Sequence, residues 1–319
     1  MFSDNMIGSI LYRILYVIVW LFSLLPLRLM YLLSDLIWLV MFACPPLRYR
    51  RKIVQKNLRE SFPDRNDSEL RSIERRFYRQ FLDQIFETVK MASMGRHRIC
   101  RHMTFSDTEV ICRDFEEGRS AVLYLGHTGN WEWISSLPLH FDSAREFCQV
   151  YHPLENRTFD RLMLKLRGRY SAKSIPMEHT LRRLLEFRRD GKPFIVGMIA
   201  DQVPLLWNIH YFTRFMNHDT PVFTGSERIA RKMDLAVYYC KVTRVRRGYY
   251  NCRFIPMFPH TADLPEYAVT EKYMRLLEEN ICEQPYLWLW THNRWKRTRQ
   301  DYLNWLASVR RDRDNNLKQ

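Results

Sequence analysis

The sequence predicts an α/β protein in which helices flank a mixed, mainly parallel sheet, with a membrane-anchoring helical segment at the N-terminus. Apolar runs of strand length alternate with helical segments, which is typical of parallel sheets because parallel strands need crossover connections. Two apolar runs begin the chain, and 46% hydrophobic residues among 319 are ample for a buried core. The expected division is a membrane anchor over residues 1–46 and one larger domain over residues 47–319.

The anchor is predicted from residues 7–25 and 29–44, which are apolar apart from a few positions such as Arg13 and Asp35. Pro26 helps to separate the two runs. Each run is close to the lower limit of roughly 17 residues for a spanning helix. One tilted span, a short hairpin, an interfacial helix and a pair of buried core helices are therefore all compatible with the pattern. We expect one span followed by an amphipathic segment.

A basic cluster follows the second run, at Arg48, Arg50, Arg51 and Lys52. Such clusters stay on the cytoplasmic side of a membrane and contact anionic headgroups. The first residues, MFSDNM, carry no positive charge, which disfavours a cleaved signal peptide. We therefore expect the larger domain to face the cytoplasm.

Composition limits the classes of partner and site. The formal net charge is +15, which predicts an anionic partner: nucleic acid, anionic lipid or an acidic carrier protein. The cysteines never form a C-x-x-C pair, and we read them as reduced thiols of a cytosolic protein rather than as a zinc or redox site. The chain also lacks an H-E-x-x-H, a Walker loop and a G-x-G-x-x-G, so metalloprotease, nucleotide-hydrolase and dinucleotide-binding functions have no support.

The elements of the larger domain follow from periodicity. Residues 51–95 are expected to be helical, with a helix start near Asp67. Short strands are expected at residues 121–125, 147–151 and 193–200, with helices at residues 155–170, 181–189 and 271–280. Residues 235–245 and 249–258 are predicted to be two longer strands joined at Arg247 and Gly248, and they suggest an antiparallel hairpin at one edge of the sheet.

The segment GHTGNWEW, residues 126–133, places an imidazole and a carboxylate where a strand should pass into a helix. On a regular helix His127 and Glu132 would point about 140° apart, so a turn must intervene, and Gly129 permits one. Such a turn could bring the Glu132 carboxylate to one nitrogen of His127, leaving the other to act as a general base. Backbone N–H groups at the helix start could then stabilise an oxyanion. The alternative is an ordinary turn followed by packing residues.

Several segments resemble one family in the same order along the chain. HTGNWE resembles the catalytic motif of the lysophospholipid acyltransferase family that includes the bacterial lipid A late acyltransferases. Residues 149–170, 184–202, 220–240 and 283–298 resemble later segments of that family. The likeness covers nearly the whole chain, including the apolar N-terminus, and the order of the matches is more specific than any one motif.

The resemblance implies an inner-membrane enzyme whose domain at residues 47–319 transfers a fatty acyl group from an acyl carrier protein or coenzyme A thioester. Neither metal nor cofactor is implied, and His127 and Glu132 would be the catalytic pair. The implied acceptor is the hydroxyl of a 3-hydroxyacyl chain on a lipid A precursor. Another glycolipid, a phospholipid or an aminolipid remains an alternative acceptor. The expected partners are an acidic acyl carrier protein and anionic membrane lipid, and we expect a monomer.

We predict that five further residues contact substrate: Asn130, Arg161, Arg167, Asp201 and Gln202. The matching family segment is rich in arginine near the site, which favours Arg161 and Arg167, although a plain solvated helix face is also compatible with them. Asp201 and Gln202 directly follow an apolar strand, at the sheet edge where α/β proteins usually bind ligands.

Two other features have simpler interpretations. Thr224 and Glu227 have the spacing of a capping box, so we expect them to be structural. The tract at residues 285–299 interleaves aromatic and basic side chains, among them Trp288, Trp290 and Arg294, which suits a bilayer surface and would also suit single-stranded nucleic acid. The apolar N-terminus favours lipid. A basic membrane-binding protein without catalytic activity is the main alternative to an enzyme, and a nucleic-acid binder is a more distant one.

Overall fold

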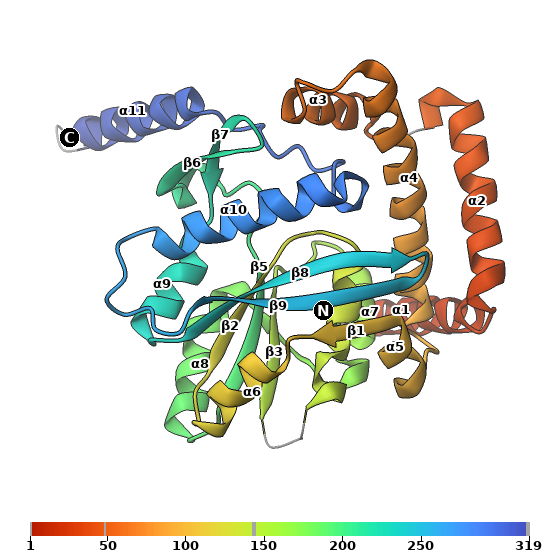
Figure 1. Ribbon diagram of the computed structural model, residues 1–319, viewed down its shortest axis with the longest axis horizontal. Coiled ribbons are helices and arrows are strands. Elements are labelled where there is room, and N and C mark those ends of the chain that lie inside the picture. Colours follow the sequence, from red (N-terminus) through yellow and green to blue (C-terminus); the bar gives the residue numbers. More distant parts are fainter. Residues whose placement is uncertain (1, 48, 142–144, 317–319) are drawn as a thin grey trace.

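A seven-stranded sheet with helices on both faces forms the centre of the protein (Figure 1). The computed structural model describes residues 2–47, 49–141 and 145–316. The sheet strands are β1 (Met103–Ser106), β2 (Ala121–Leu125), β3 (Glu146–Tyr151), β4 (Lys173–Pro176), β5 (Phe194–Ile199), β8 (Ala236–Arg246) and β9 (Tyr249–Phe258). A separate hairpin consists of β6 (Tyr211–Phe215) and β7 (His218–Val222). The predicted fold class is confirmed.

Helices precede the sheet, connect its strands and end the described chain. Before and beside β1 lie α1 (Phe2–Ser23), α2 (Leu27–Ala43), α3 (Arg51–Ser61), α4 (Asp67–Lys90), α5 (Arg96–His102) and α6 (Glu109–Glu116). Later helices are the 3-10 segment η2 (Trp131–His140), α7 (Arg157–Arg167), α8 (Thr180–Arg189), α9 (Gly225–Lys232), α10 (Ala268–Glu283) and α11 (Arg299–Asn316). Figure 1 shows α11 extending away from the body of the molecule.

The strand order is β1-β9-β8-β2-β5-β3-β4, and every pairing is parallel except that of β8 with β9. The predicted hairpin of two long strands is therefore confirmed. It does not form the edge of the sheet, because β1 pairs with the outer side of β9. The carboxyl ends of β2, β3 and β5 meet at one edge, where parallel sheets usually present functional groups.

Strand β2 shows why the central strands are apolar throughout. Its side chains at Val122 and Tyr124 pack into one hydrophobic core, which also contains residues of α8, α9 and α10. Those at Ala121, Leu123 and Leu125 pack into a second core with residues of η2, α5 and α7. A sheet covered on both faces must bury both sets of alternating side chains, so its strands read as continuous apolar runs.

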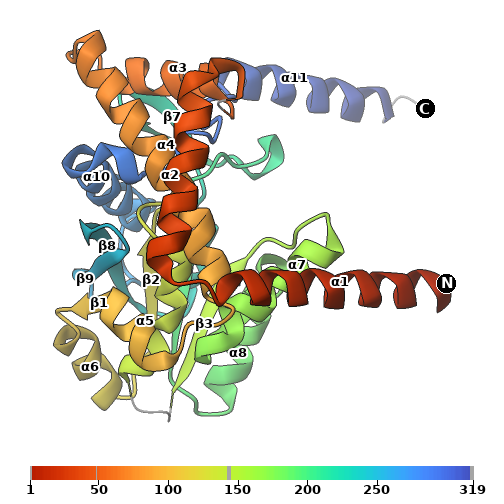
Figure 2. The ribbon, with the colours of Figure 1, turned by 90° about the vertical axis from the view of Figure 1, so that its right-hand side faces the viewer.

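Helices α1 and α2 are the structural counterparts of the predicted anchor. Within the described residues no single helix is long and apolar enough to cross a bilayer, and α1 from Gly8 with α2 passes that test only as a pair, bent by 104°. Figure 2 shows α1 running away from the body while α2 lies along α4. The single predicted span is thus not shown, and the boundary at residue 46 stays a prediction.

Polar contacts fix α2 and the bend before it to α4. The Lys90 ammonium donates to the carbonyl oxygens of Ser23 and Leu25, at 2.6 and 2.9 Å, in the segment between α1 and α2. Further along, the Ser34 hydroxyl donates to the Asp83 carboxylate at 2.8 Å, and both side chains are buried. Because breaking a buried hydrogen bond leaves its partner unsatisfied, α2 is an integral part of the packed domain.

The helical region predicted at residues 51–95 consists of α3 and α4, which are separated near Pro63, and α4 begins at Asp67 as predicted. The segment after β2, expected to be a helix, is a 3-10 helix that contains Pro138. The strands β1, β4, β6 and β7 were not predicted. The capping box is wrong: Thr224 makes no capping bond, and the Glu227 carboxylate instead accepts from Thr270. Arg48 of the basic cluster lies outside the described residues.

Candidate active site

The segment after β2 forms the sharp turn that the sequence predicted. Gly129 has a φ of +60°, and a Cβ atom there would lie 2.8 Å from the Val242 side chain, so only glycine fits without strain. The turn also pairs with the C-terminal tract: the Gly129 N–H donates to the Leu287 carbonyl and the Leu289 N–H donates to the His127 carbonyl, each at 3.1 Å. The tract therefore supports the turn from its other side.

His127 pairs with Asp201, which follows the neighbouring strand β5. The imidazole Nδ1 lies 2.5 Å from Oδ1 of Asp201, and the His127 backbone N–H donates to Oδ2 at 2.8 Å. The Trp288 indole N–H donates to the same Oδ2 at 2.8 Å. Asp201 is buried, with 2% of its surface exposed, so these donors replace the water that its carboxylate has lost.

The charge of Asp201 determines the tautomer of His127. Burial alone would raise the pKa of Asp201, but the charge of His127, its side-chain and backbone hydrogen bonds and the Trp288 indole lower it to about 2. Asp201 is therefore ionised at neutral pH and can only accept hydrogen bonds. In the neutral imidazole the proton therefore lies on Nδ1, facing Asp201, and the lone pair is on Nε2.

The second ring nitrogen of His127, Nε2, lies beside side chains that a substrate can displace. The Gln202 amide nitrogen lies 3.3 Å from Nε2, and the Trp131 ring packs edge-on against the imidazole with the centroids 5.0 Å apart. The His127 side chain is 18% exposed. A histidine with an oriented tautomer and a partly accessible lone pair can act as a general base.

The predicted contact between Glu132 and His127 is wrong. The Glu132 carboxylate instead forms a bidentate pair with Arg167 at the end of α7, with Nε and Nη2 donating at 2.7 and 2.6 Å. Burial alone would lower the pKa of Arg167, but the hydrogen bonds and charge of Glu132 raise it. A guanidinium matches a carboxylate with two parallel bonds, which an imidazole cannot do. The sequence placed Arg167 near the site without identifying this partner.

A cavity of about 380 Å³ borders Glu132. Its apolar walls come from α4, the turn, α7 and the C-terminal tract: Phe81, Ile85, Trp131, Met163 and Leu289. Polar groups, including His292, complete the lining. Two lining residues contact His127: the Trp131 ring packs against its imidazole, and the Leu289 N–H donates to its backbone carbonyl, so the cavity borders the turn that carries the histidine. A largely apolar cavity with a few polar groups suits an amphipathic ligand.

The other residues predicted to contact substrate lie in different surroundings. Asn130 is fully buried, and its side chain bonds to Glu87 and to the Trp133 backbone, so it supports the turn rather than facing the cavity. Arg161 stacks its guanidinium 4.4 Å from the Tyr12 ring of α1. Asp201 and Gln202 lie at the site, but both contact His127.

The C-terminal tract, which the sequence predicted to lie at a bilayer surface, instead contributes buried side chains beside the turn. Trp288, Trp290 and Arg294 are buried, so they do not lie on a bilayer surface. Burial lowers the pKa of His292 to about 4, and its neutral ring accepts from the Val203 N–H at 3.3 Å. The role of Trp288 in binding Asp201 was missed, because no local pattern links residues so far apart in sequence.

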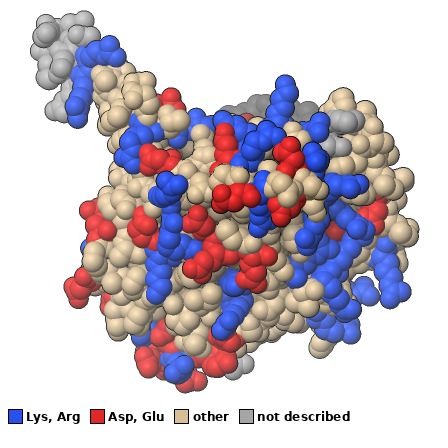
Figure 3. Space-filling view, turned by 45° about the horizontal axis from the view of Figure 1, so that its top comes forward, with Lys and Arg blue, Asp and Glu red and all other residues tan. Residues whose placement is uncertain are grey.

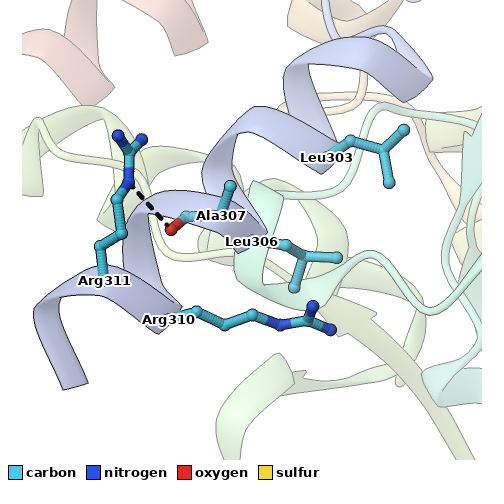
Figure 4. Close-up of a pocket in the computed structure, with 5 residues that line it drawn as sticks. All are labelled: Leu303, Leu306, Ala307, Arg310 and Arg311. Carbon is cyan, nitrogen blue, oxygen red and sulfur yellow. Dashed lines mark hydrogen bonds between the residues drawn. The ribbon is translucent and has the colours of Figure 1, made fainter. Parts of the chain in front are cut away.

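Two further observations concern other parts of the described chain. A hollow of about 300 Å³ on α11 is lined by Leu303, Leu306, Ala307, Arg310 and Arg311 (Figure 4). None of the residues of the turn at His127 lines this hollow, and its lining includes no histidine, aspartate or glutamate that could act as a general base. Among the described residues, no group of three or more His, Cys, Asp and Glu side chains could hold a metal ion.

Comparison with known proteins identifies one family. A family model described as bacterial lipid A biosynthesis acyltransferase matches residues 6–297. The match includes α1 from residue 6, the whole of α2 and every residue of the site described above, and it ends before α11. No curated protein matches the chain.

Proposed function

The chain belongs to the bacterial lipid A biosynthesis acyltransferases, and we propose that it transfers a fatty acyl group from an acyl carrier protein or coenzyme A thioester to a hydroxyl of a lipid A precursor at the inner membrane. Among the acceptors of this chemistry, the hydroxyl of a 3-hydroxyacyl chain is the one we propose. The observation that carries the proposal is the His127–Asp201 pair, on a turn whose residues Trp131 and Glu132 line a largely apolar cavity.

His127 acts as the general base. The acceptor hydroxyl takes the place of the Gln202 amide at Nε2 and gives its proton to the imidazole as its oxygen attacks the thioester carbonyl carbon. Asp201 stabilises the imidazolium that forms. The tetrahedral intermediate then expels the thiolate, which takes the proton from His127, so that the products are an ester and a free thiol.

We propose that Arg167 stabilises negative charge on the substrate or on the tetrahedral intermediate. Its Nε and Nη2 are occupied by Glu132, while its Nη1 makes no hydrogen bond to the described part of the chain. Glu132, which lines the cavity, thus contributes to catalysis by fixing the position of the guanidinium. A positioned donor of this kind stabilises an oxyanion or binds a phosphate.

Surface properties support a membrane location with the domain on the cytoplasmic side. The outer side of α1 exposes apolar side chains, including Ile10, Ile14 and Ile18. Basic side chains are also exposed in rows, Lys52 and Lys56 on α3 and Arg71 and Arg75 on α4. Figure 3 shows many Lys and Arg side chains on the side of the molecule that it presents. Such a surface attracts anionic lipid and an acidic acyl carrier protein, the partners we propose.

Transfer of a labelled acyl group from its acyl carrier protein or coenzyme A thioester to a lipid A precursor, in detergent or membranes, tests the proposal. In the purified full chain, His127→Ala is expected to lower transfer by at least roughly a hundredfold, because it removes the base. His179→Ala changes an exposed histidine before α8 and serves as the control. Unchanged transfer in His127→Ala would remove the mechanism.

The choice of acceptor is tested in the same assay. Lipid A precursor, phospholipid, aminolipid and another glycolipid are offered separately with the same thioester. We expect the lipid A precursor to be acylated fastest, and mass spectrometry of the product locates the new ester. Transfer to a different lipid alone would keep the chemistry and replace the acceptor.

A further inference from the structure

A single buried carboxylate joins the catalytic turn to the N-terminal helices. Glu87 lies near the end of α4 and is fully buried. Its Oε2 accepts from the Asn130 amide at 2.7 Å, and its Oε1 accepts from the Tyr31 hydroxyl of α2 at 2.7 Å. The Tyr250 hydroxyl of β9 donates to Oε2 at 3.0 Å. In addition, the Trp133 indole N–H donates to the Glu87 backbone carbonyl at 3.2 Å.

Tyr31 reaches this carboxylate through a slot that the β8–β9 turn leaves open. A Cβ atom at Gly248 would lie only 2.1 Å from the Tyr31 hydroxyl, so a larger residue would displace the tyrosine. The Arg247 guanidinium stacks 4.5 Å from the Tyr31 ring and also pairs with Asp35 of α2 and Asp83 of α4. The position of the hydroxyl is therefore fixed from several sides.

Asn130 transmits the position of Glu87 to both functional side chains of the turn. It stands between His127 and Glu132 in sequence, and its side-chain oxygen accepts from the Trp133 N–H at 3.1 Å, which caps η2. Its amide nitrogen is bound by Glu87. A shift of Asn130 would therefore move the end of the turn that carries His127 and the start of η2 that carries Glu132.

We propose that Tyr31 and Glu87 are positioning residues through which the docking of α2 on α4 sets the geometry of the catalytic turn. This inference rests on the proposed acyl transfer. Helix α2, which the sequence predicted to be part of a membrane anchor, is then a structural requirement of the active site as well. Acyl transfer is sensitive to the alignment of the base, because small displacements of reacting groups cost large factors in rate.

The variant Tyr31→Phe tests the proposal, because it removes only the hydroxyl and keeps the ring in its slot. In the full chain we expect kcat for acyl transfer to fall about tenfold, with KM changed by less than about twofold, since Tyr31 does not border the cavity. Glu87→Gln is a second variant, which replaces an acceptor by a donor facing Asn130, and it is expected to lower kcat further.

Tyr238→Phe is the matched control. The Tyr238 hydroxyl also donates to a largely buried carboxylate, that of Asp114, but this pair lies far from the turn, between β8 and α6. The control loses a comparable hydrogen bond and is expected to keep the wild-type kcat. Thermal unfolding of both tyrosine variants compares their loss of stability, which should be similar.

A spectroscopic readout separates positioning from activity. With 5-fluorotryptophan incorporated, the 19F signal of Trp133, assigned with Trp133→Phe, should shift in Tyr31→Phe and stay in place in Tyr238→Phe. Equal kcat in Tyr31→Phe and wild type, or equal losses in the two tyrosine variants, would overturn the proposal. If the wild type transfers no acyl group while the Trp133 signal still moves only in Tyr31→Phe, the proposed function fails and the coupling of α2 to the turn is supported.

Discussion

Two ion pairs flank the proposed reaction centre, and they differ in location and in partners. Asp201 follows β5 at the carboxyl edge of the sheet and receives donors from His127 and Trp288. Glu132 borders the cavity, and its carboxylate is held by the two parallel bonds of Arg167. Both carboxylates are buried, but only the second belongs to a wall that a ligand would contact.

The difference assigns separate tasks to the two carboxylates. A buried anion beside an imidazole fixes its tautomer and stabilises its charged form, which is what a general base requires. A carboxylate bound to a guanidinium at a cavity wall orients that guanidinium toward a ligand. If the tasks are distinct, changes at Asp201 and at Glu132 should differ in their effect on the rate of acyl transfer.

Asp201→Asn should be the most damaging change among the partners of His127. The amide can present its N–H to Nδ1 and favour the wrong tautomer, so we expect kcat to fall by roughly a hundredfold or more. Transfer of a labelled acyl group measures the effect, and circular dichroism checks the fold. Wild-type kcat in this variant would contradict the assignment of Asp201.

Acid should lower the free energy of unfolding, because it protonates the Asp201 carboxylate. Its pKa of about 2 lies below its ordinary value of 3.8. A lowered pKa stabilises the folded state above the ordinary value, and this stabilisation, roughly 2 kcal/mol, is lost as the pH falls through the folded pKa. Urea unfolding at several pH values should show a smaller acid-dependent loss in Asp201→Asn, whereas Asp190→Asn, at an exposed residue, should behave like the wild type.

Breaking the other pair should have a smaller effect on rate. We expect Arg167→Met and Glu132→Gln each to lower kcat/KM about tenfold, because either change leaves the guanidinium site incomplete. The double variant should resemble the single ones, since both remove the same unit. Multiplicative losses in the double variant would show that the two residues act independently.

The smallest expected effect is at Trp288. Trp288→Phe keeps an aromatic ring and removes one donor from Asp201, which retains both bonds from His127. We expect kcat to fall about fivefold, as for one hydrogen bond to a charged group. Trp305→Phe on α11 is the control for loss of an indole outside the site, and an equal fall in both variants would argue against a role for Trp288.

The central strands were predictable because a sheet buried on both faces produces continuous apolar runs, as in β2, β5 and β8. The turn at Gly129 was predicted as well, although the contact between His127 and Glu132 that it was expected to make possible does not form. The partners of these two side chains were not, because they depend on which strand ends are neighbours. Asp201 is 74 residues from His127 in sequence, and only the pairing of β2 with β5 brings the two together.

The tertiary environment of α2 and of the C-terminal tract could not be predicted from local sequence patterns either. The apolar run of α2 is compatible with burial and with membrane contact, and the helix combines polar contacts to α4 with exposed apolar side chains such as Leu32 and Leu36. The C-terminal tract was expected on a surface, yet Trp288, Trp290 and Arg294 are buried, whereas Lys296 and Arg299 are exposed. Side chains in these segments take their role from tertiary neighbours that sequence spacing does not encode.

The central claim is that Asp201, and not Glu132, orients His127. The most direct test is 15N NMR of the imidazole in wild type, Asp201→Asn and Glu132→Gln. For the neutral imidazole we expect a proton on Nδ1 and none on Nε2 in the wild type, the same signals in Glu132→Gln, and altered signals in Asp201→Asn. A spectrum that changes in Glu132→Gln and is unchanged in Asp201→Asn would contradict it.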